Sequence, residues 1–242
     1  MSEKNYECKL LEWDTDYFGV KSARVNLLGN VDERGQEDIL SFCENYDFVT
    51  IANFENRNEN NLWIGNKTAA LLTDVNIQFV KELNINEKCS DDYTHVTNSL
   101  PVNDQILNIA RKSFRYSRFF NDPNLSESKS QNIYLRWTEG SFQQESKYFV
   151  ICEREGNIAG YLLFSSEDNY ATVELIAVDE AYQGQGVGKA LIKAMESFAF
   201  DKNINQIKVG TQVNNIPAVQ FYSKMGFTYV SCGSIYHLWR RI

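Results

Sequence analysis

The residues with the most specific chemical pattern form a glycine-rich stretch from Gln183 to Lys189, with the sequence QGQGVGK. An apolar run at 173–178 precedes it and an amphipathic run at 187–200 follows it, so we interpret it as a turn between a strand and a helix. Glycines let backbone N–H groups approach a ligand that side chains would hold away. A helix N-terminus adds partial positive charge at the same place. The stretch therefore predicts a pyrophosphate-binding site.

The spacing within this stretch excludes two common phosphate-binding loops. Lys189 is followed by Ala190, so the Lys-Ser/Thr pair of a Walker A loop is missing. Glycines at 184, 186 and 188 are too closely spaced for the G-x-G-x-x-G of dinucleotide-binding folds. The remaining pattern is Gln-x-x-Gly-x-Gly directly after a strand that ends near Val178 and Asp179. An ordinary strand-to-helix turn is the alternative interpretation.

Two titratable residues, Glu174 and Tyr222, lie within predicted secondary structure of the second half. Glu174 interrupts an apolar run typical of a central strand, where a carboxylate needs a partner or a function. Tyr222 lies on a short predicted helix with Pro217 in its first turn and Gly226 at its end. The alternatives are a structural carboxylate and a tyrosine that packs in the core.

Two other segments combine aromatic with charged residues. Residues 10–19 form an aromatic and acidic segment that we interpret as a loop, and residues 114–123 interleave two arginines with aromatic rings. Such arginines can hold an anionic or ring-bearing ligand, although they also suit a helix C-terminus. A small cluster of packed aromatic rings is the alternative for the first segment. The residues expected to bind such a ligand, as a substrate, are Trp13, Asp14, Tyr17, Phe18, Arg115, Arg118 and Phe119.

The remaining pattern predicts an α/β (α+β) chain. In the first half we expect a helix from Asp32 to about 45, a loop at 55–61, and strands at 21–28, 48–54, 69–73 and 75–83. In the second half we expect helices at 103–114, 126–138, 187–200 and 217–226, with Ile133, Tyr134 and Trp137 facing inward. We expect strands there at 148–152, 158–164, 173–178, 207–213, 227–230 and 235–239, the first two as a hairpin. The polar segment 84–100 predicts a boundary that divides the chain into 1–98 and 99–242.

Composition excludes several classes of protein. A net charge of −8 and a pI near 4.9 argue against nucleic acid as a partner. No apolar run approaches the roughly 20 residues of a membrane helix, and the first residues lack a signal-peptide core. Five scattered cysteines without a C-x-x-C pair predict reduced thiols in a cytoplasmic protein, and two histidines make a metal site unexpected. The sequence is compatible with a homodimer.

Three separated pieces resemble, in order and spacing, the GNAT acetyltransferase superfamily across about residues 100–242. They are ELIAVD at 174–179, the loop at 183–188, and the pattern N-x-x-A-x-x-x-Y-x-x-x-GF at 215–227. The resemblance implies a central mixed, splayed β-sheet flanked by helices and acetyl-CoA as the cofactor. It also implies that the loop amides hold the pyrophosphate and that the pantetheine arm lies between the splayed strands. The implied cofactor-binding residues are Ile176, Ala177, Val178, Gln183, Gly184, Gln185, Gly186, Val187, Gly188, Lys189, Asn215, Ala218 and Tyr222.

Motifs in the first half of the chain indicate a smaller group within this superfamily. LEWDT-x-x-FG at 11–19, FR-x-SRF at 114–119 and NDP at 121–123 are similar to the dTDP-fucosamine acetyltransferase family. This implies a smaller N-terminal α/β domain that resembles part of a GNAT fold. It further implies N-acetylation of a nucleotide-linked amino-deoxysugar, similar to dTDP-4-amino-4,6-dideoxygalactose, for surface polysaccharide.

The resemblance also implies a mechanism. A neutral amine attacks the acetyl thioester, Tyr222 protonates the departing thiolate, and Glu174 is the candidate base. Tyrosine and alkyl thiols have comparable pKa values, roughly 8.5 to 10, so the acid is well matched. One alternative is a GNAT enzyme for another small amine or a protein N-terminus. A second is a module that binds CoA without catalysis.

Overall fold

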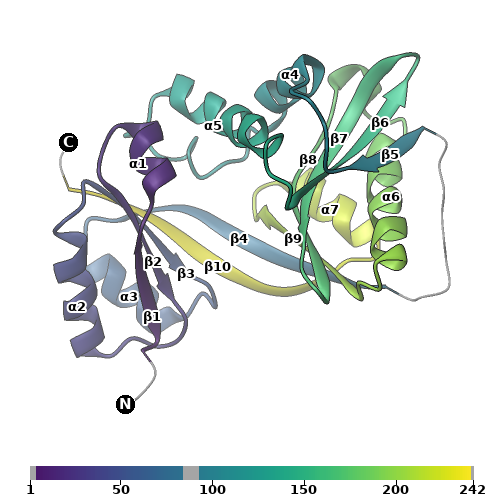
Figure 1. The fold of residues 1–242 in the computed structure, drawn as a ribbon. Coiled ribbons are helices and arrows are strands. Elements are labelled where there is room, and N and C mark those ends of the chain that lie inside the picture. Colours follow the sequence, from purple (N-terminus) through teal and green to yellow (C-terminus); the bar gives the residue numbers. More distant parts are fainter. Residues whose placement is uncertain (1–3, 84–92, 241–242) are drawn as a thin grey trace.

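A single mixed β-sheet runs through the whole molecule in the computed structural model, which describes residues 4–83 and 93–240. Ten strands in the described ranges follow the order β1-β2-β3-β10-β4-β9-β8-β7-β6-β5. Figure 1 shows two lobes joined by the long strands β4 and β10. None of the helices in these ranges is both long and apolar enough to cross a membrane.

The first lobe contains three strands of its own and part of β10. Helices α2 and α3 cover one face of these strands, where apolar side chains such as Val25, Ile39 and Trp63 form a core. Helix α1 and the segment before α5 lie on the opposite face, where Phe18 and Phe119 pack against Phe48. Its elements are β1 (Tyr6–Leu10), α1 (Glu12–Phe18), β2 (Ser22–Leu27), α2 (Glu33–Cys43), β3 (Phe48–Asn53) and α3 (Asn58–Lys67).

The second lobe is a sheet with a helix layer on each face. Helix α4 packs on one face around Ile106 and Tyr161, and α6 packs on the other around Leu191 and Phe164. Its elements are β5 (Thr94–Thr97), α4 (Asp104–Ser113), α5 (Glu127–Ser141), β6 (Lys147–Arg154), β7 (Asn157–Ser166), β8 (Tyr170–Val178), η1 (Glu180–Tyr182), α6 (Val187–Asp201), β9 (Gln206–Gln212) and α7 (Ile216–Lys224).

Strands β4 (Leu71–Glu82) and β10 (Thr228–Trp239) connect the two lobes. Residues 234–239 of β10 pair with β3, whereas residues 228–237 pair with the other neighbour, β4. Residues 76–82 of β4 also pair with β9. The sheet is therefore continuous between the lobes, and the proposed division into 1–98 and 99–242 remains a prediction. Part of its polar boundary segment, 84–92, lies outside the described residues.

The structure confirms the fold class and several local predictions. The Asp32 carboxylate caps α2 by accepting a hydrogen bond from Gly35 N at 2.9 Å. The turn between β6 and β7 has positive φ at Glu155 and Gly156, as expected for a hairpin. Gly226 ends α7 with φ of 83°.

Five local predictions were wrong. The segment expected as a loop at 10–19 contains α1, which ends at Gly19 with φ of 71°. The expected loop at 55–61 contains the start of α3, where the Asn53 side chain donates a hydrogen bond to Asn61 Oδ1 and accepts one from Asn60 Nδ2. The pairs of strands expected at 69–83 and at 227–239 are the single strands β4 and β10, each carrying register shifts. Trp137 is 42% exposed instead of facing inward.

Candidate active site

A gap opens between β8 and β9 near the middle of the sheet. These parallel strands pair from Tyr170–Gln206 to Val173–Val209 and no further within the described residues. Beyond that point β8 continues along β7 to Val178, while β9 follows β4. The strand edge at residues 174–178 is therefore open for a ligand to pair with its backbone groups.

A β-bulge at Glu174 marks the start of this gap. Val173 pairs with Phe164 and Leu175 with Leu163, so Glu174 is the extra residue. The Glu174 side chain forms an ion pair with Lys147 Nζ, and its side chain is 10% exposed. Its Oε2 atom is buried without a hydrogen-bond partner among the described residues. The carboxylate expected as a base is thus already engaged by a cation.

Tyr222 lies at the other side of the gap, on α7. The Asn215 side chain caps this helix by accepting from Ala218 N at 3.3 Å, and Pro217 occupies its first turn. The Tyr222 ring is 3% exposed and packs 6.0 Å from the Phe79 ring. Burial raises the pKa of Tyr222 above its ordinary value. The phenol therefore keeps its proton at neutral pH, as a general acid must.

A cavity of about 430 Å³ joins these features. Residues at the end of α4, in the segment after it and in α5 line one side of it. Residues of α7 line the other side, and residues of β8, β9 and β4 lie between them. The cavity therefore passes through the sheet at the gap. Its lining residues are Asn76, Gln78, Ser113, Phe114, Arg115, Tyr116, Ser117, Arg118, Tyr134, Trp137, Thr172, Val173, Glu174, Leu175, Ile176, Val209, Gly210, Thr211, Gln212, Asn215, Ala218 and Tyr222.

The glycine-rich stretch lies beside the gap at the start of α6. Gly184 and Gly186 have φ of 76° and 81°, a conformation that glycine adopts without strain. Gly188 lies against α7, because a Cβ there would be 3.3 Å from the Phe221 ring. The first amides of α6, from Val187 onward, have no partner within the helix and can donate to an anion.

The other expected cofactor residues differ in their exposure. Ile176 lines the cavity, Ala177 is 5% exposed, and Val178 accepts a weak hydrogen bond from the Gln183 amide at 3.5 Å. The Gln185 amide donates to Ala181 O at 2.9 Å, and Lys189 is exposed. The loop thus presents mainly backbone N–H groups to solvent, as a pyrophosphate site requires.

The structure separates the seven residues expected to bind an acceptor. Arg115 and Arg118 line the cavity, although Arg115 is 75% exposed and lies 3.7 Å from the Glu180 carboxylate. Phe18 and Phe119 are only 4% and 5% exposed, which corrects their expected place on a ligand-facing surface. They are core residues because α1 packs the two rings 5.9 Å apart. Asp14 lies on the same helix, partly buried.

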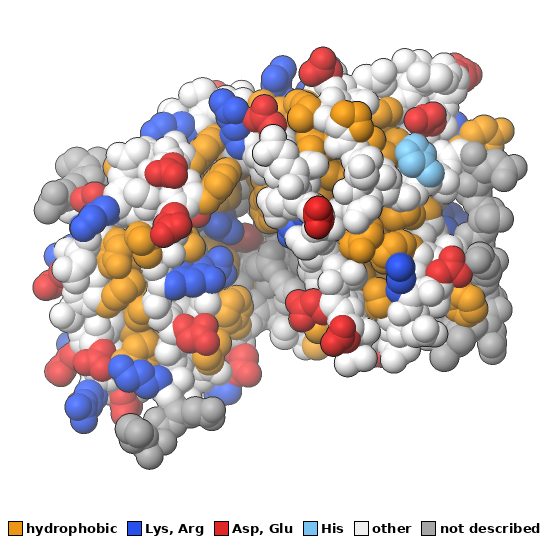
Figure 2. Space-filling model, viewed as in Figure 1, with side chains coloured by type: hydrophobic (Ala, Val, Ile, Leu, Met, Phe, Trp, Pro, Cys, Tyr) orange, Lys and Arg blue, Asp and Glu red, His pale blue; other side chains and the backbone are white. Residues whose placement is uncertain are grey.

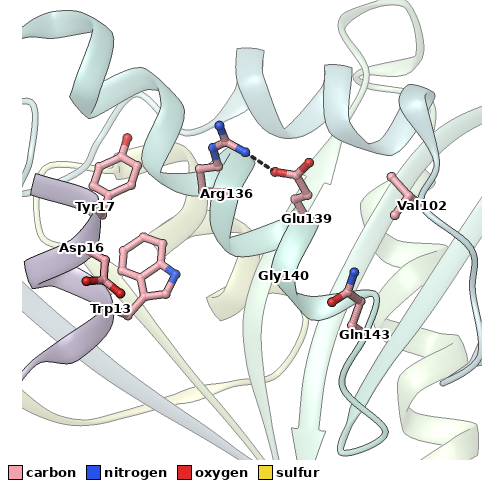
Figure 3. A pocket seen from close by; sticks show the side chains of 8 residues that line it. All are labelled: Trp13, Asp16, Tyr17, Val102, Arg136, Glu139, Gly140 and Gln143. Carbon is pink, nitrogen blue, oxygen red and sulfur yellow. Dashed lines mark hydrogen bonds and ion pairs between the residues drawn. The ribbon is translucent and has the colours of Figure 1, made fainter.

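Trp13 and Tyr17 lie at a different hollow, of about 650 Å³, between α1 and α5 (Figure 3). Their rings stack 5.0 Å apart, and Tyr17 donates a hydrogen bond to Lys129 O at 2.6 Å. Across the hollow, Arg136 and Glu139 of α5 form an ion pair of 2.8 Å. Neither aromatic residue lines the cavity at the gap. The geometry therefore gives them a place between the lobes, outside the candidate active site.

Asp74 on β4 is a candidate functional residue that the sequence did not indicate. It is 9% exposed, and burial raises its pKa to about 6 despite the opposing effects of Arg118 and of a hydrogen bond to Gln212. Both of those residues line the cavity. A carboxylate that titrates near pH 6 is suited to accept a proton at neutral pH. Its position is set by strand pairing between distant segments, so no local motif could have indicated it.

Comparisons with known proteins point to one family. A sequence model described as "Acetyltransferase (GNAT) family" matches residues 104–227. "Spore coat polysaccharide biosynthesis protein SpsD" of Bacillus subtilis (strain 168) is 29% identical over 134 residues, which cover 55% of this chain and 46% of that protein. This chain spans about half the length of the first curated relatives that it matches.

Two solved structures share the fold. One is a "Tandem GNAT protein from the clavulanic acid biosynthesis pathway", with a TM-score of 0.60, 12% identity, and coverage of 90% of this chain and 75% of its own. The other is a functionally unknown conserved protein from Staphylococcus epidermidis ATCC 12228. It has a TM-score of 0.66 and 12% identity, with coverage of 100% of this chain and 94% of its own. At such low identity, both similarities concern the fold alone.

Proposed function

Because this chain belongs to the GNAT acetyltransferase family, whose members use acetyl-CoA, we propose that it N-acetylates a nucleotide-linked amino-deoxysugar. The acceptor class is a sugar similar to dTDP-4-amino-4,6-dideoxygalactose, used for surface polysaccharide. The observation that carries the proposal is the cavity through the sheet, which Tyr222 and Arg118 both line. Such a cavity lets a cofactor and an acceptor meet from opposite faces.

The cofactor side of the proposal uses the gap and the glycine-rich stretch. Acetyl-CoA would place its pyrophosphate on the first amides of α6, from Val187 to Lys189. Its pantetheine arm would pair with the open edge of β8 at residues 174–178. Backbone groups there would orient the thioester and stabilise the oxyanion that forms on attack. Asn215 and Ala218 would contact the arm from α7.

The proton transfers would involve Asp74 and Tyr222. The acceptor nitrogen attacks as a neutral amine, so its ammonium form must first lose a proton. We assign this proton to Asp74 through water, because Glu174 is already paired with Lys147. The amine would form a bond to the acetyl carbon, the carbon–sulfur bond would break, and Tyr222 would donate its proton to the departing thiolate. Its buried phenol would remain protonated until that step.

The choice of acceptor rests on chemistry near the cavity and on one relative. Arg118 offers a cation to the diphosphate of a nucleotide sugar in a protein whose net charge is −8. The Bacillus subtilis relative is described by its role in spore coat polysaccharide biosynthesis. Both observations support a sugar acceptor over a polyamine, which would itself be cationic.

The test is release of CoA from acetyl-CoA in the presence of single acceptors. We expect rapid thiol release with aminated dTDP- or UDP-sugars and no release above background with spermidine or with peptides that carry a free N-terminus. If the protein acetylates a polyamine or a peptide faster than any sugar nucleotide, that amine is the acceptor and the sugar proposal is wrong. Tight acetyl-CoA binding without turnover on any of these amines would favour a non-catalytic module.

A further inference from the structure

Three buried polar atoms lack a hydrogen-bond partner where the two lobes meet. Among the described residues they are Thr50 Oγ1, Arg118 Nε and His237 Nε2. Thr50 and His237 are both 0% exposed. Most buried polar groups in folded proteins are paired, so each of these atoms requires an explanation. Thr50 and His237 are enclosed, and Arg118 is the member of this group that lines the cavity.

Strand pairing places Arg24 beside two of these residues. Arg24 on β2 pairs with Thr50 on β3, and Thr50 pairs with His237 on β10. Paired residues on neighbouring strands project from the same face of a sheet, and the strands lie about 4.8 Å apart. The three side chains therefore form a row about 10 Å wide. The row lies on the face opposite α2 and α3, because the alternating residue Val25 packs with those helices.

Arg118 lies over this row from the segment between α4 and α5. Its guanidinium is 4.3 Å from the Phe119 ring, and that ring is 5.9 Å from the His237 ring. Asp122 fixes the segment by accepting hydrogen bonds from His237 Nδ1 at 2.7 Å and from Trp239 Nε1 at 2.8 Å. Arg118 is therefore held in place between the row and the cavity that it lines.

The two arginines carry positive charge that the described residues do not neutralise by contact. Within those residues, neither Arg24 nor Arg118 has a carboxylate within the 4.0 Å of an ion pair. Burial, and then repulsion from Arg118, lowers the pKa of Arg24 to about 10. Asp14 and Asp74 are the acidic neighbours, and burial raises the pKa of each more than the arginines lower it.

Arg24 Nε donates a hydrogen bond to Asn26 Oδ1 at 2.7 Å, but neither guanidinium has a carboxylate partner among the described residues. Such groups in a partly buried site are unfavourable, and an anion that bonds to both would offset that cost. Arginine is well suited to bind phosphate oxygens, because its planar fork can make two parallel hydrogen bonds. Figure 2 shows a hollow between the two lobes with charged side chains at its rim, and Arg118 lines the cavity of about 430 Å³. A diphosphate meets these requirements, because it carries oxygens for two forks at once.

We propose that Arg24 and Arg118, one from each lobe, bind the diphosphate of the acceptor. The proposal rests on the proposed function and adds a residue, Arg24, that no sequence motif indicated. The sugar ring then extends along the cavity, and its amine reaches the thioester near Tyr222.

Calorimetric titration with dTDP and with inorganic pyrophosphate tests the site, with CoA present at saturation so that the glycine-rich stretch is occupied. We expect Arg24→Met and Arg118→Met each to weaken dTDP binding about tenfold or more, the loss usual for a hydrogen bond to a charged group. Arg34→Met is the matched control, because Arg34 is exposed on α2, and it should bind dTDP as the wild type does. If a methionine variant melts early, the lysine variant at that position keeps the charge and should lose less affinity.

The acetylation assay separates this inference from the proposed function. In Arg24→Met the KM for the sugar nucleotide should rise about tenfold while the KM for acetyl-CoA stays unchanged. An unchanged sugar-nucleotide KM in this variant would refute the site and leave the function standing. A wild type that binds dTDP through both arginines but acetylates no sugar nucleotide would refute the function and leave the site standing. Wild-type protein that binds neither dTDP nor pyrophosphate would refute the site.

Discussion

Replacing Tyr222 with Phe removes one oxygen atom from the proposed general acid and leaves its packing in place. The ring keeps its neighbours Phe79, Phe221 and Phe227 at centroid distances of 6.0, 5.3 and 5.5 Å. The hydroxyl has no hydrogen-bond partner among the described residues, so removing it leaves no other group unpaired. We therefore expect the free energy of unfolding to change by less than about 1 kcal/mol.

The expected loss is in turnover. A lost proton donor lowers a rate by roughly 10² to 10⁴, which corresponds to about 2.7 to 5.4 kcal/mol in the barrier. The affinity for acetyl-CoA should stay the same, because the cofactor contacts predicted for the glycine-rich stretch and β8 are unchanged. Since burial raises the pKa of Tyr222 above its ordinary 10.0, the wild-type rate should not fall through tyrosine ionisation below that pH.

Initial rates of thiol release at saturating acetyl-CoA measure the effect of Tyr222→Phe, with calorimetry for affinity and thermal melting for stability. The prediction requires a large fall in kcat with an unchanged dissociation constant and melting temperature. A kcat within about threefold of the wild type would refute the assignment and transfer the proton to another donor. A fall in kcat accompanied by early melting would show instead that the hydroxyl supports the fold.

Three further changes test other parts of the site. Gly186→Val should abolish acetyl-CoA binding in calorimetry, because φ of 81° is strained for a branched residue and its side chain would occupy the pyrophosphate position; unchanged binding would contradict the loop assignment. In the wild type, protonation of Asp74 should lower kcat/KM as the pH falls below about 6, and Asp74→Asn should remove this pH dependence. Since ionisation of Asp74 opposes folding once the pH exceeds its unfolded pKa, this variant should also melt above the wild type at pH 8 but not at pH 3; a pH-independent difference would contradict this account. Lys147→Met should destabilise the protein by roughly 3 kcal/mol in urea unfolding, because it leaves Glu174 buried and unpaired; a change below about 1 kcal/mol would show that water already screens the pair.

Local signals in the sequence were sufficient to predict several turns and helix ends. The cap at Asp32, the turn at Glu155 and Gly156, and the end of α7 at Gly226 each depend on one or two residues and their immediate neighbours. The glycine-rich stretch belongs to the same class, since its backbone conformation is set by its own glycines. Such features can be predicted because the residues that interact are neighbours in the sequence.

Features that depend on contacts between distant segments were missed. Helix α3 has a weak amphipathic pattern and is held by amide contacts from Asn53, so its composition indicated a loop. Arg24 and Asp74 lie on strands about 50 residues apart in sequence, and only the pairing of the sheet relates them to Arg118. Phe18 and Phe119 were expected to face a ligand, but their mutual packing decides their burial. These placements follow from the topology of the sheet, which residue spacing does not specify.

The position of β10 between β3 and β4 has a consequence for synthesis of the chain on the ribosome. Residues 48–53 and 71–82 are made well before the strand that joins them, which is residues 228–239. Until then both strands expose an unpaired edge, and such edges are prone to aggregate. The nascent first lobe must therefore wait until residues 228–239 are made, so slow elongation or early termination should favour chaperone binding and proteolysis.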